Sequence, residues 1–123
     1  MTIMEALHRI DTLKPNTYSN PEKIRWLSIL DGIIYTDIIQ THEGEKAVAY
    51  SDYDDEVDLS TSLLVPAPYD DIYIQWLSAQ IDYTNGEYGK YNNAMIAYNT
   101  AYIAFAKHYN AKNKPKSSGR FKF

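Results

Sequence analysis

The stretch YGKYNNAMIAYNTAYIAFAKHY, residues 88 to 109, has the most regular helical pattern in the chain. Its large side chains recur at a spacing of three and four residues through three heptads, which is the repeat of one helix face. They are Tyr88, Tyr91, Met95, Tyr98, Tyr102, Phe105 and Tyr109. Alanines fill much of the remainder and raise the helix propensity. The pattern predicts one long helix with a stripe of tyrosines along one face.

This tyrosine stripe has two interpretations. A buried tyrosine needs a partner for its hydroxyl, so an aromatic seam within one chain would place its hydroxyls at the rim. Tyrosine is also enriched where two subunits meet, because such interfaces are buried without being dry. We expect some of each. The tyrosines assigned to a subunit interface are Tyr88, Tyr91, Tyr98, Tyr102 and Tyr109.

Another helix is predicted directly upstream, beginning near Tyr69 and running to about Tyr83. The prolines of LVPAPYDD precede it and keep the approach extended. Its aromatic stripe slips by one residue against the stripe of residues 88 to 109. The slip coincides with Thr84, Asn85 and Gly86, which are turn formers. The slip indicates either a helical hairpin or one long helix kinked at this point, and we favour the hairpin.

The N-terminal segment IMEALHRIDTL predicts a short helix over residues 3 to 13. Its isoleucines and leucines recur at helical spacing, and Pro15 stops the segment. The same segment interleaves charged with apolar residues, so it lacks the uninterrupted apolar run of a secretory signal.

A second helix is predicted from about residue 20 to residue 40. Ser19 or Asn20 can cap its free amides, and Pro21 suits its first turn. Its apolar residues share one broad face, which we expect to be buried. The residues that fall mostly on the opposite face are Arg25, Ser28, Asp31, Gly32, Tyr35 and Thr36.

Between the second and third helices, residues 42 to 62 hold seven acidic residues against one lysine and show no sustained helical period. We predict a long acidic loop, and loops of this length are often functional. Its candidate residues are Asp52, Asp54, Asp55, Glu56 and Asp58. Asp52, Asp54, Glu56 and Asp58 alternate as calcium-loop ligands do. However, Val57 stands where the turn needs glycine and Leu63 where a bidentate glutamate is needed. We therefore expect a solvated loop and no metal.

The last residues, AKNKPKSSGRFKF, contain lysines and an arginine without any acidic residue. Proline, glycine and serines predict a flexible basic tail over residues 111 to 123, after a single helical domain over residues 1 to 110. The tail residues assigned to docking are Lys114, Lys116, Arg120, Phe121 and Phe123. The two phenylalanines are possible anchors that a merely solubilising tail would not need.

Composition argues against several classes of function. The chain has no cysteine, and His8, His42 and His108 each stand alone, so no nucleophile with a paired base is evident and we expect no enzyme and no cofactor. The net charge of -4 argues against a general nucleic-acid binder, because that affinity comes from basic side chains. No run of 18 apolar residues is present, so we expect no membrane partner. The predicted fold is all-α: a four-helix bundle-like domain with a long acidic loop and a flexible C-terminal tail.

The order KPNTYSNPEKIRWLSILDGII, THEGE and LLVPAPYDDIYIQWLSAQIDYTNGEYGKYNNAMIAYNTAYIAFAKHYN resembles short structural proteins of tailed bacteriophages and prophages described as head-tail connectors. The resemblance covers residues 14 to 110 and lies in aromatic, proline and asparagine positions. It implies a structural subunit of a ring that binds the portal, extends the DNA channel and joins the head to the tail.

The implied partners are further copies of the chain in a homo-oligomeric ring, the portal protein, a tail-side connector or stopper protein, and passing DNA without sequence-specific binding. The implied location is the head-tail junction of the virion, after synthesis in the bacterial cytoplasm. The alternatives are a phage tail-completion protein or another small phage-encoded protein-binding module. A DNA-binding regulator is disfavoured because the long helix carries only Lys90 and Lys107 as basic residues.

Overall fold

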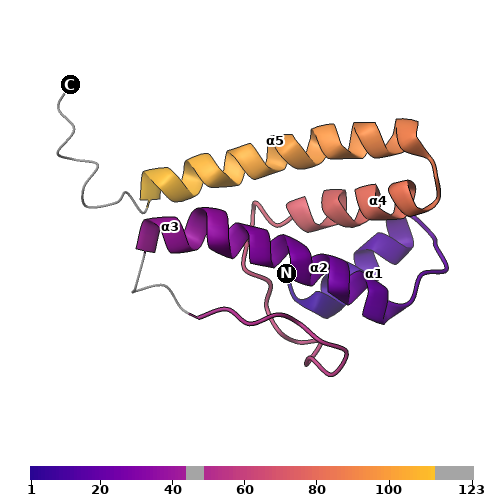
Figure 1. Ribbon diagram of the computed structural model, residues 1–123, viewed down its shortest axis with the longest axis horizontal. Coiled ribbons are helices and arrows are strands. Elements are labelled where there is room, and N and C mark those ends of the chain that lie inside the picture. The colour runs from indigo at the N-terminus through magenta and orange to yellow at the C-terminus, as the bar shows by residue number, and fades with distance from the viewer. Residues whose placement is uncertain (44–48, 113–123) are drawn as a thin grey trace.

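The computed structural model describes residues 1–43 and 49–112, and these residues form a mainly α-helical fold (Figure 1). The elements are α1 (Ile3–Leu13), α2 (Asn20–Ile34), the π-helical turn η1 (Tyr35–Ile39), α3 (Gln40–Glu43), α4 (Ile72–Thr84) and α5 (Tyr88–Lys112). Within the described ranges there is no β-strand, only an isolated bridge between Thr2 and Ser62. The all-α class expected from the sequence is therefore confirmed.

The first two helices start where their capping residues lie. Thr2 accepts a hydrogen bond from the backbone amide of Glu5, whose carboxylate accepts one from the amide of Thr2, which completes a capping box. Ser19 caps α2 by accepting from the amide of Glu22, and Pro21 lies in the first turn. The predicted range of the first helix, residues 3 to 13, and the predicted Ser19 cap of the second helix are confirmed, whereas the Thr2 capping box was not predicted.

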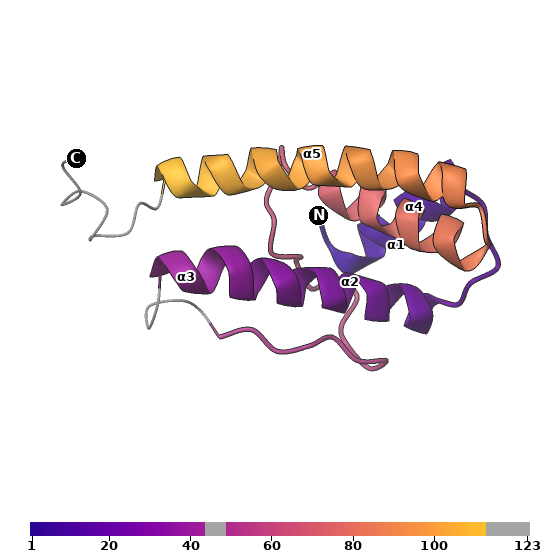
Figure 2. The ribbon, with the colours of Figure 1, turned by 45° about the horizontal axis from the view of Figure 1, so that its top comes forward.

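The predicted second helix continues past residue 40, because η1 and α3 extend α2 into one continuous rod (Figure 2). A π-helical turn inserts one extra residue per turn and rotates the faces of the helix that follow it. The rod ends beside the C-terminal end of α5, where the rings of His42 and Tyr109 lie 5.7 Å apart.

Helix α4 is the central element, since it packs against α5, α2 and α1. It begins at Ile72 rather than near Tyr69 as predicted, because the residues before it form turns. Nearly all its length is lined by core residues. Three helices supply most of the fully buried aliphatic core, and Val65 adds to it from the segment before α4. The helical residues are Ile3, Ile10, Leu27, Leu30, Ile34, Ile72, Leu77 and Ile81.

Helices α4 and α5 form a hairpin, so the favoured of the two predictions for residues 84–86 is confirmed. Gly86 has a φ of 77°, in the left-handed region that glycine adopts without steric cost. The amide of Glu87 donates to the carbonyl of Asp82 at 2.9 Å, and the amide of Gly86 donates to Tyr83 at 3.0 Å. These bonds satisfy carbonyls at the end of α4 and reverse the chain.

Residues 49–71 run along α2 without helix or strand and are attached to it by a buried carboxylate. Asp31 is fully buried and accepts hydrogen bonds from the hydroxyls of Tyr53 and Tyr73 and from the amide of Leu64. Burial raises the pKa of Asp31, and the two tyrosine hydroxyls and the amide oppose that shift. The sequence places Asp31 opposite the apolar face of its helix, and Asp31 is nevertheless buried because this segment covers that side of α2.

Candidate interaction surface

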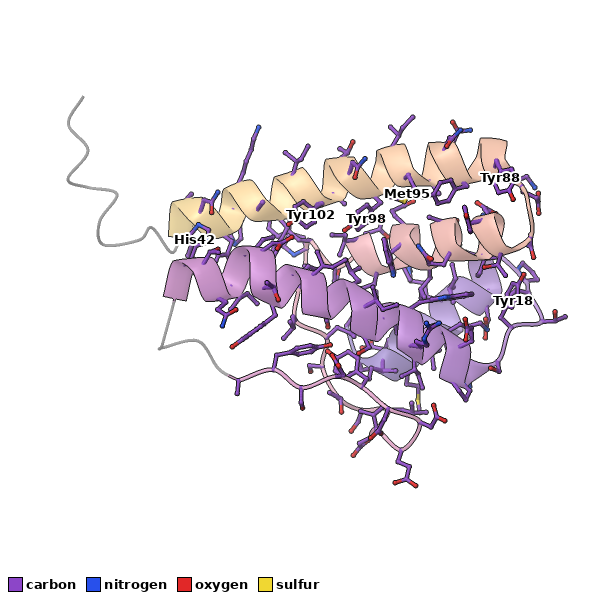
Figure 3. The ribbon with its side chains drawn as sticks, viewed as in Figure 1. Tyr18, His42, Tyr88, Met95, Tyr98 and Tyr102 are labelled. Atoms are coloured by element: carbon purple, nitrogen blue, oxygen red, sulfur yellow. The ribbon has the colours of Figure 1, made fainter. Side chains whose placement is uncertain are left out.

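The inward face of α5 is part of the core of the chain. Ala94, Tyr98 and Phe105 are buried, and the ring of Tyr98 lies 5.1 Å from the ring of Trp76 on α4. Figure 3 shows Met95, Tyr98 and Tyr102 directed from α5 toward the neighbouring helices. Burial raises the pKa of Tyr98 to about 12, since the phenolate would lose hydration there. The stripe therefore serves as an intramolecular seam.

The five tyrosines assigned to a subunit interface differ in how much surface they still offer. Tyr98 is buried, while Tyr91, Tyr102 and Tyr109 are half-buried. Tyr88 is 59% exposed, next to the ring of Tyr83 at 5.6 Å. The intramolecular interpretation accounts for most of the stripe. The assignment of these tyrosines to a subunit interface stays a prediction, and Tyr88 has the most exposed surface for such a contact.

The outward face of α5 combines exposed apolar side chains with a lack of charged residues. Ile96 and Ile103 are 65% and 53% exposed, although they are among the largest aliphatic side chains. Around them lie exposed amides and a hydroxyl rather than lysine or glutamate. We call Asn92, Ile96, Asn99, Thr100 and Ile103 the outer face of α5. No charged residue occurs anywhere from Tyr91 to Ala106.

Helix propensity does not explain this composition. Asparagine and threonine are poorer helix formers than the lysine, glutamate or glutamine that commonly fill exposed helix positions. The hydroxyl of Thr100 donates back to the carbonyl of Ile96 at 3.0 Å, a local bond that competes with helix formation. By contrast, depletion of charge together with exposed apolar side chains is the composition of interface cores. The outer face of α5 is the best candidate for an interaction surface.

Reasoning from the sequence missed Ile96 and Ile103. The prediction considered only the aromatic stripe, and both isoleucines lie between its residues in the sequence. The signal in the sequence that points to them is the absence of charged residues from Tyr91 to Ala106. Such a run covers all sides of a helix, so the side that faces outward is uncharged as well.

The predicted acidic residues are exposed and hold their own turns. Asp54 accepts from the amide of Glu56 at 2.9 Å, and Asp58 accepts from the amide and the hydroxyl of Ser60. The bonds from Ser60 lower the pKa of Asp58. Asp52 and Asp55 are also exposed. Within the part of the chain that the structure describes, no three His, Asp or Glu side chains are grouped to hold a metal ion.

The predicted docking residues Lys114, Lys116, Arg120, Phe121 and Phe123 lie outside the described residues. Among residues 1–43 and 49–112, no helix is both long enough and apolar enough to cross a bilayer. No protein-family model, curated protein or solved structure matches the chain.

Proposed function

We propose that the chain is a structural subunit of a phage head-tail connector ring, which binds the portal, extends the DNA channel and joins the head to the tail. In this proposal the helices form a four-helix bundle-like domain, and the acidic segment is a long loop between the second and third of them. The subunit performs no catalysis and uses no cofactor. It is made in the host cytoplasm and resides at the head-tail junction of the virion.

The observation that carries the proposal is the outer face of α5, with Ile96 and Ile103 exposed on a helix surface without charge. Full removal of one isoleucine side chain from water is worth about 1.5–3 kcal/mol, and this chain alone realises only part of that gain because both side chains are more than half exposed. A subunit that assembles with other proteins needs such a surface. The resemblance of residues 14 to 110 to connector proteins names the kind of assembly.

The acidic loop and the basic tail have complementary roles in this proposal. The tail of one subunit reaches a neighbour or the portal, with Phe121 and Phe123 as its anchors. The exposed carboxylates of Asp52, Asp54 and Asp55 provide a complementary surface. Where they face the channel they also repel the phosphates of passing DNA within a Debye length of about 8 to 10 Å.

The test uses DNA-filled heads that carry a portal but lack the connector. Purified protein is added, the heads are sedimented, and the bound protein is measured. Asn99→Lys places a charge in the centre of the outer face without harming the helix, since lysine is the better helix former. Asn110→Lys is the matched control, because it makes the same change on α5 beyond the uncharged run, between Lys107 and Lys112.

We expect the wild type and Asn110→Lys to bind and Asn99→Lys to bind at least about tenfold less, since desolvating an unpaired lysine costs more than the 1.4 kcal/mol of one factor of ten. A chain truncated after Asn110 tests the tail: equal binding would keep the connector and remove the tail from its mechanism. Binding of both folded forms to isolated tails, and not to heads, would favour the tail-completion alternative. Binding to neither would leave only the protein-binding module.

A further inference from the structure

A groove runs along α2, between this helix and the acidic segment that covers it. Two adjoining hollows of about 420 and 360 Å³ form the groove, and both are bordered by Arg25 of α2 and Tyr53 of the segment. Along the helix, the groove extends from Pro21 to Gly32. Unlike the outer face of α5, it has walls from two separate parts of the chain.

The wall opposite α2 is held in place by hydrogen bonds. The hydroxyl of Tyr53 donates to the buried carboxylate of Asp31 at 2.6 Å, and the amide of Tyr53 donates to the hydroxyl of Ser28 at 3.0 Å. The hydroxyl of Tyr50 donates to the carbonyl of Ser28, also at 3.0 Å. The groove is therefore already formed in the free chain, so less conformational entropy is lost when a partner binds.

The lining of the groove combines carboxylates with apolar surface. Among the described residues that line it, only Arg25 is basic, and its guanidinium lies 3.6 Å from the carboxylate of Glu22. On the α2 side, Ile29 is 43% exposed, and Gly32 leaves space beside it because it has no side chain. The groove therefore fits a positively charged partner with apolar side chains. The carboxylates that border it are those of Asp52, Asp54, Asp55 and Glu56.

The stretch GRFKF, residues 119–123 of the basic tail, matches the groove in length and in pattern. At about 1.5 Å per residue of α2, the groove is about 16 Å long. Five residues of extended chain span about 16 to 18 Å. Successive side chains of an extended chain point to opposite sides, so Phe121 and Phe123 share one side and Arg120 and Lys122 share the other. The phenylalanines can thus face α2 while the basic side chains face the carboxylates.

The length of the tail argues against binding to the groove of the same copy. The tail follows Lys112, at the end of α5 that lies beside His42, and α5 and the acidic segment lie on opposite sides of the rod of α2 and α3 (Figures 1 and 2). From His42 back to Ile29 the rod measures about 20 Å, and its width adds about 10 Å. Phe121 is nine residues beyond Lys112 and reaches at most about 30 to 32 Å. Only a fully stretched tail would touch the near end of its own groove.

We infer that the groove binds residues 119–123 of a second copy of the chain, with the two phenylalanines against α2 and with Arg120 and Lys122 toward the carboxylates. Groove and tail are different surfaces, so the contact is heterologous and each copy offers both to its neighbours. The inference rests on the proposed function and deepens it, since it names where on the next subunit the tail binds. Exposed ion pairs are weak and screened by salt, so the contact is weak between free copies and strengthens where a partner holds them side by side.

A fluorescent peptide of residues 111–123 tests the contact, because it presents the tail as a second copy would. Full-length chain is added to the peptide, and fluorescence anisotropy measures the binding. The groove variant is Asp52→Asn with Asp55→Asn, which removes one carboxylate from each hollow. The matched control is Asp37→Asn with Asp71→Asn, which removes the same charge at exposed positions outside the groove. Circular dichroism establishes that each variant is folded.

We expect the wild type and the control to bind the peptide equally, and the groove variant to bind it about three- to tenfold more weakly at low salt, because two exposed ion pairs are lost. The difference should vanish at about 1 M salt, where the Debye length is about 3 Å. Equal weakening in the groove variant and the control would overturn the inference. A scrambled peptide of the same composition that binds as tightly would overturn it in favour of general attraction between charges.

The phenylalanines separate a second copy from the chain's own tail. A peptide with Phe121→Ala and Phe123→Ala should bind at least about tenfold more weakly, because it loses two apolar contacts. The full-length chain with the same two substitutions should bind the unchanged peptide as the wild type does. Much tighter binding by that chain would overturn the assignment to a second copy, since it would mean that the wild type fills its groove with its own tail.

None of these measurements uses phage heads, so a failure of this inference can be told from a failure of the proposed function. Absence of peptide binding, together with binding of the full-length chain to heads, would overturn only the contact between groove and tail. Peptide binding that the groove variant weakens, without any binding to heads, would support this contact and count against the connector.

Discussion

The two faces of α5 have opposite relations to the same chain. On the inward face, Phe105 is buried and Tyr98 packs on Trp76, so these residues hold the helix to the molecule. On the outward face, Ile96 and Ile103 contact mostly water, in a setting without charge. Both faces carry large apolar side chains, yet only the inward face is packed within the monomer. Apolar residues on the two sides of one helix therefore have different roles.

The largest effect that can test this contrast comes from truncating one residue on each face. Phe105→Ala should lower the free energy of unfolding by about 3–5 kcal/mol, since it opens a cavity in a buried site. Ile103→Ala, two residues earlier and 53% exposed, should change it by less than about 0.5 kcal/mol. Urea unfolding followed by circular dichroism measures both. Similar losses for the two variants would mean that the outward face also supports the monomer.

A smaller effect should appear at alkaline pH. The pKa of Tyr98 is raised to about 12, so between pH 10 and that value the unfolded chain ionises this tyrosine while the folded chain does not. The stability that Tyr98 contributes is complete below pH 10 and is lost as the pH rises through 12, by about 1–3 kcal/mol in all. In the Tyr98→Phe variant, the free energy of unfolding should therefore fall less steeply with rising pH over this range.

Tyr88→Phe is the control for the alkaline experiment, because its ring is 59% exposed. It should follow the wild type in urea titrations at pH 10, 11 and 12. The contrast between the two faces of the helix would be weakened if both phenylalanine variants changed the slope equally.

The smallest effect sharpens the contrast from the outward side. Asn99→Ala should raise the free energy of unfolding by about 0.5 kcal/mol, because alanine is the better helix former and Asn99 is exposed. Such an increase in the free energy of unfolding would mean that Asn99 does not contribute to the stability of the monomer. The same substitution at Asn110, near the end of the helix, should give less, since helix ends fray. A clear loss at Asn99 would reveal a contact that the monomer depends on.

Most of the helices could be predicted because their signals are local. The capping residues Thr2 and Ser19 lie directly before their helices, and Gly86 marks the hairpin. The boundaries were less accurate: the second helix runs on to Glu43 through a π-helical turn, and α4 starts at Ile72. Those helix ends depend on how the neighbouring segments pack, and the spacing of apolar residues along the sequence carries no information about that packing.

The candidate site was predicted only in part. The sequence identified α5 as the important helix, but it directed attention to the stripe that includes Tyr98 and not to Ile96. Periodicity tells which residues share a face, whereas it does not tell which face another element of the same chain will cover. The exposure of Ile96 follows from the position of α4 under the other side of α5.

The all-α class, a break in the helix at residues 84–86 and the uncharged run from Tyr91 to Ala106 could be read from the sequence, because helix spacing, turn formers and charge are properties of neighbouring residues. That the break is a hairpin turn and not a kink followed from the packing of α4 against α5. The burial of Asp31 and the exposure of Ile96 became evident from the three-dimensional packing alone, and both are contrary to what a polar and an apolar side chain would suggest. Burial depends on which distant segment covers a side chain. Here Tyr53, Leu64 and Tyr73 cover and hydrogen-bond the carboxylate, and no described segment covers the isoleucine.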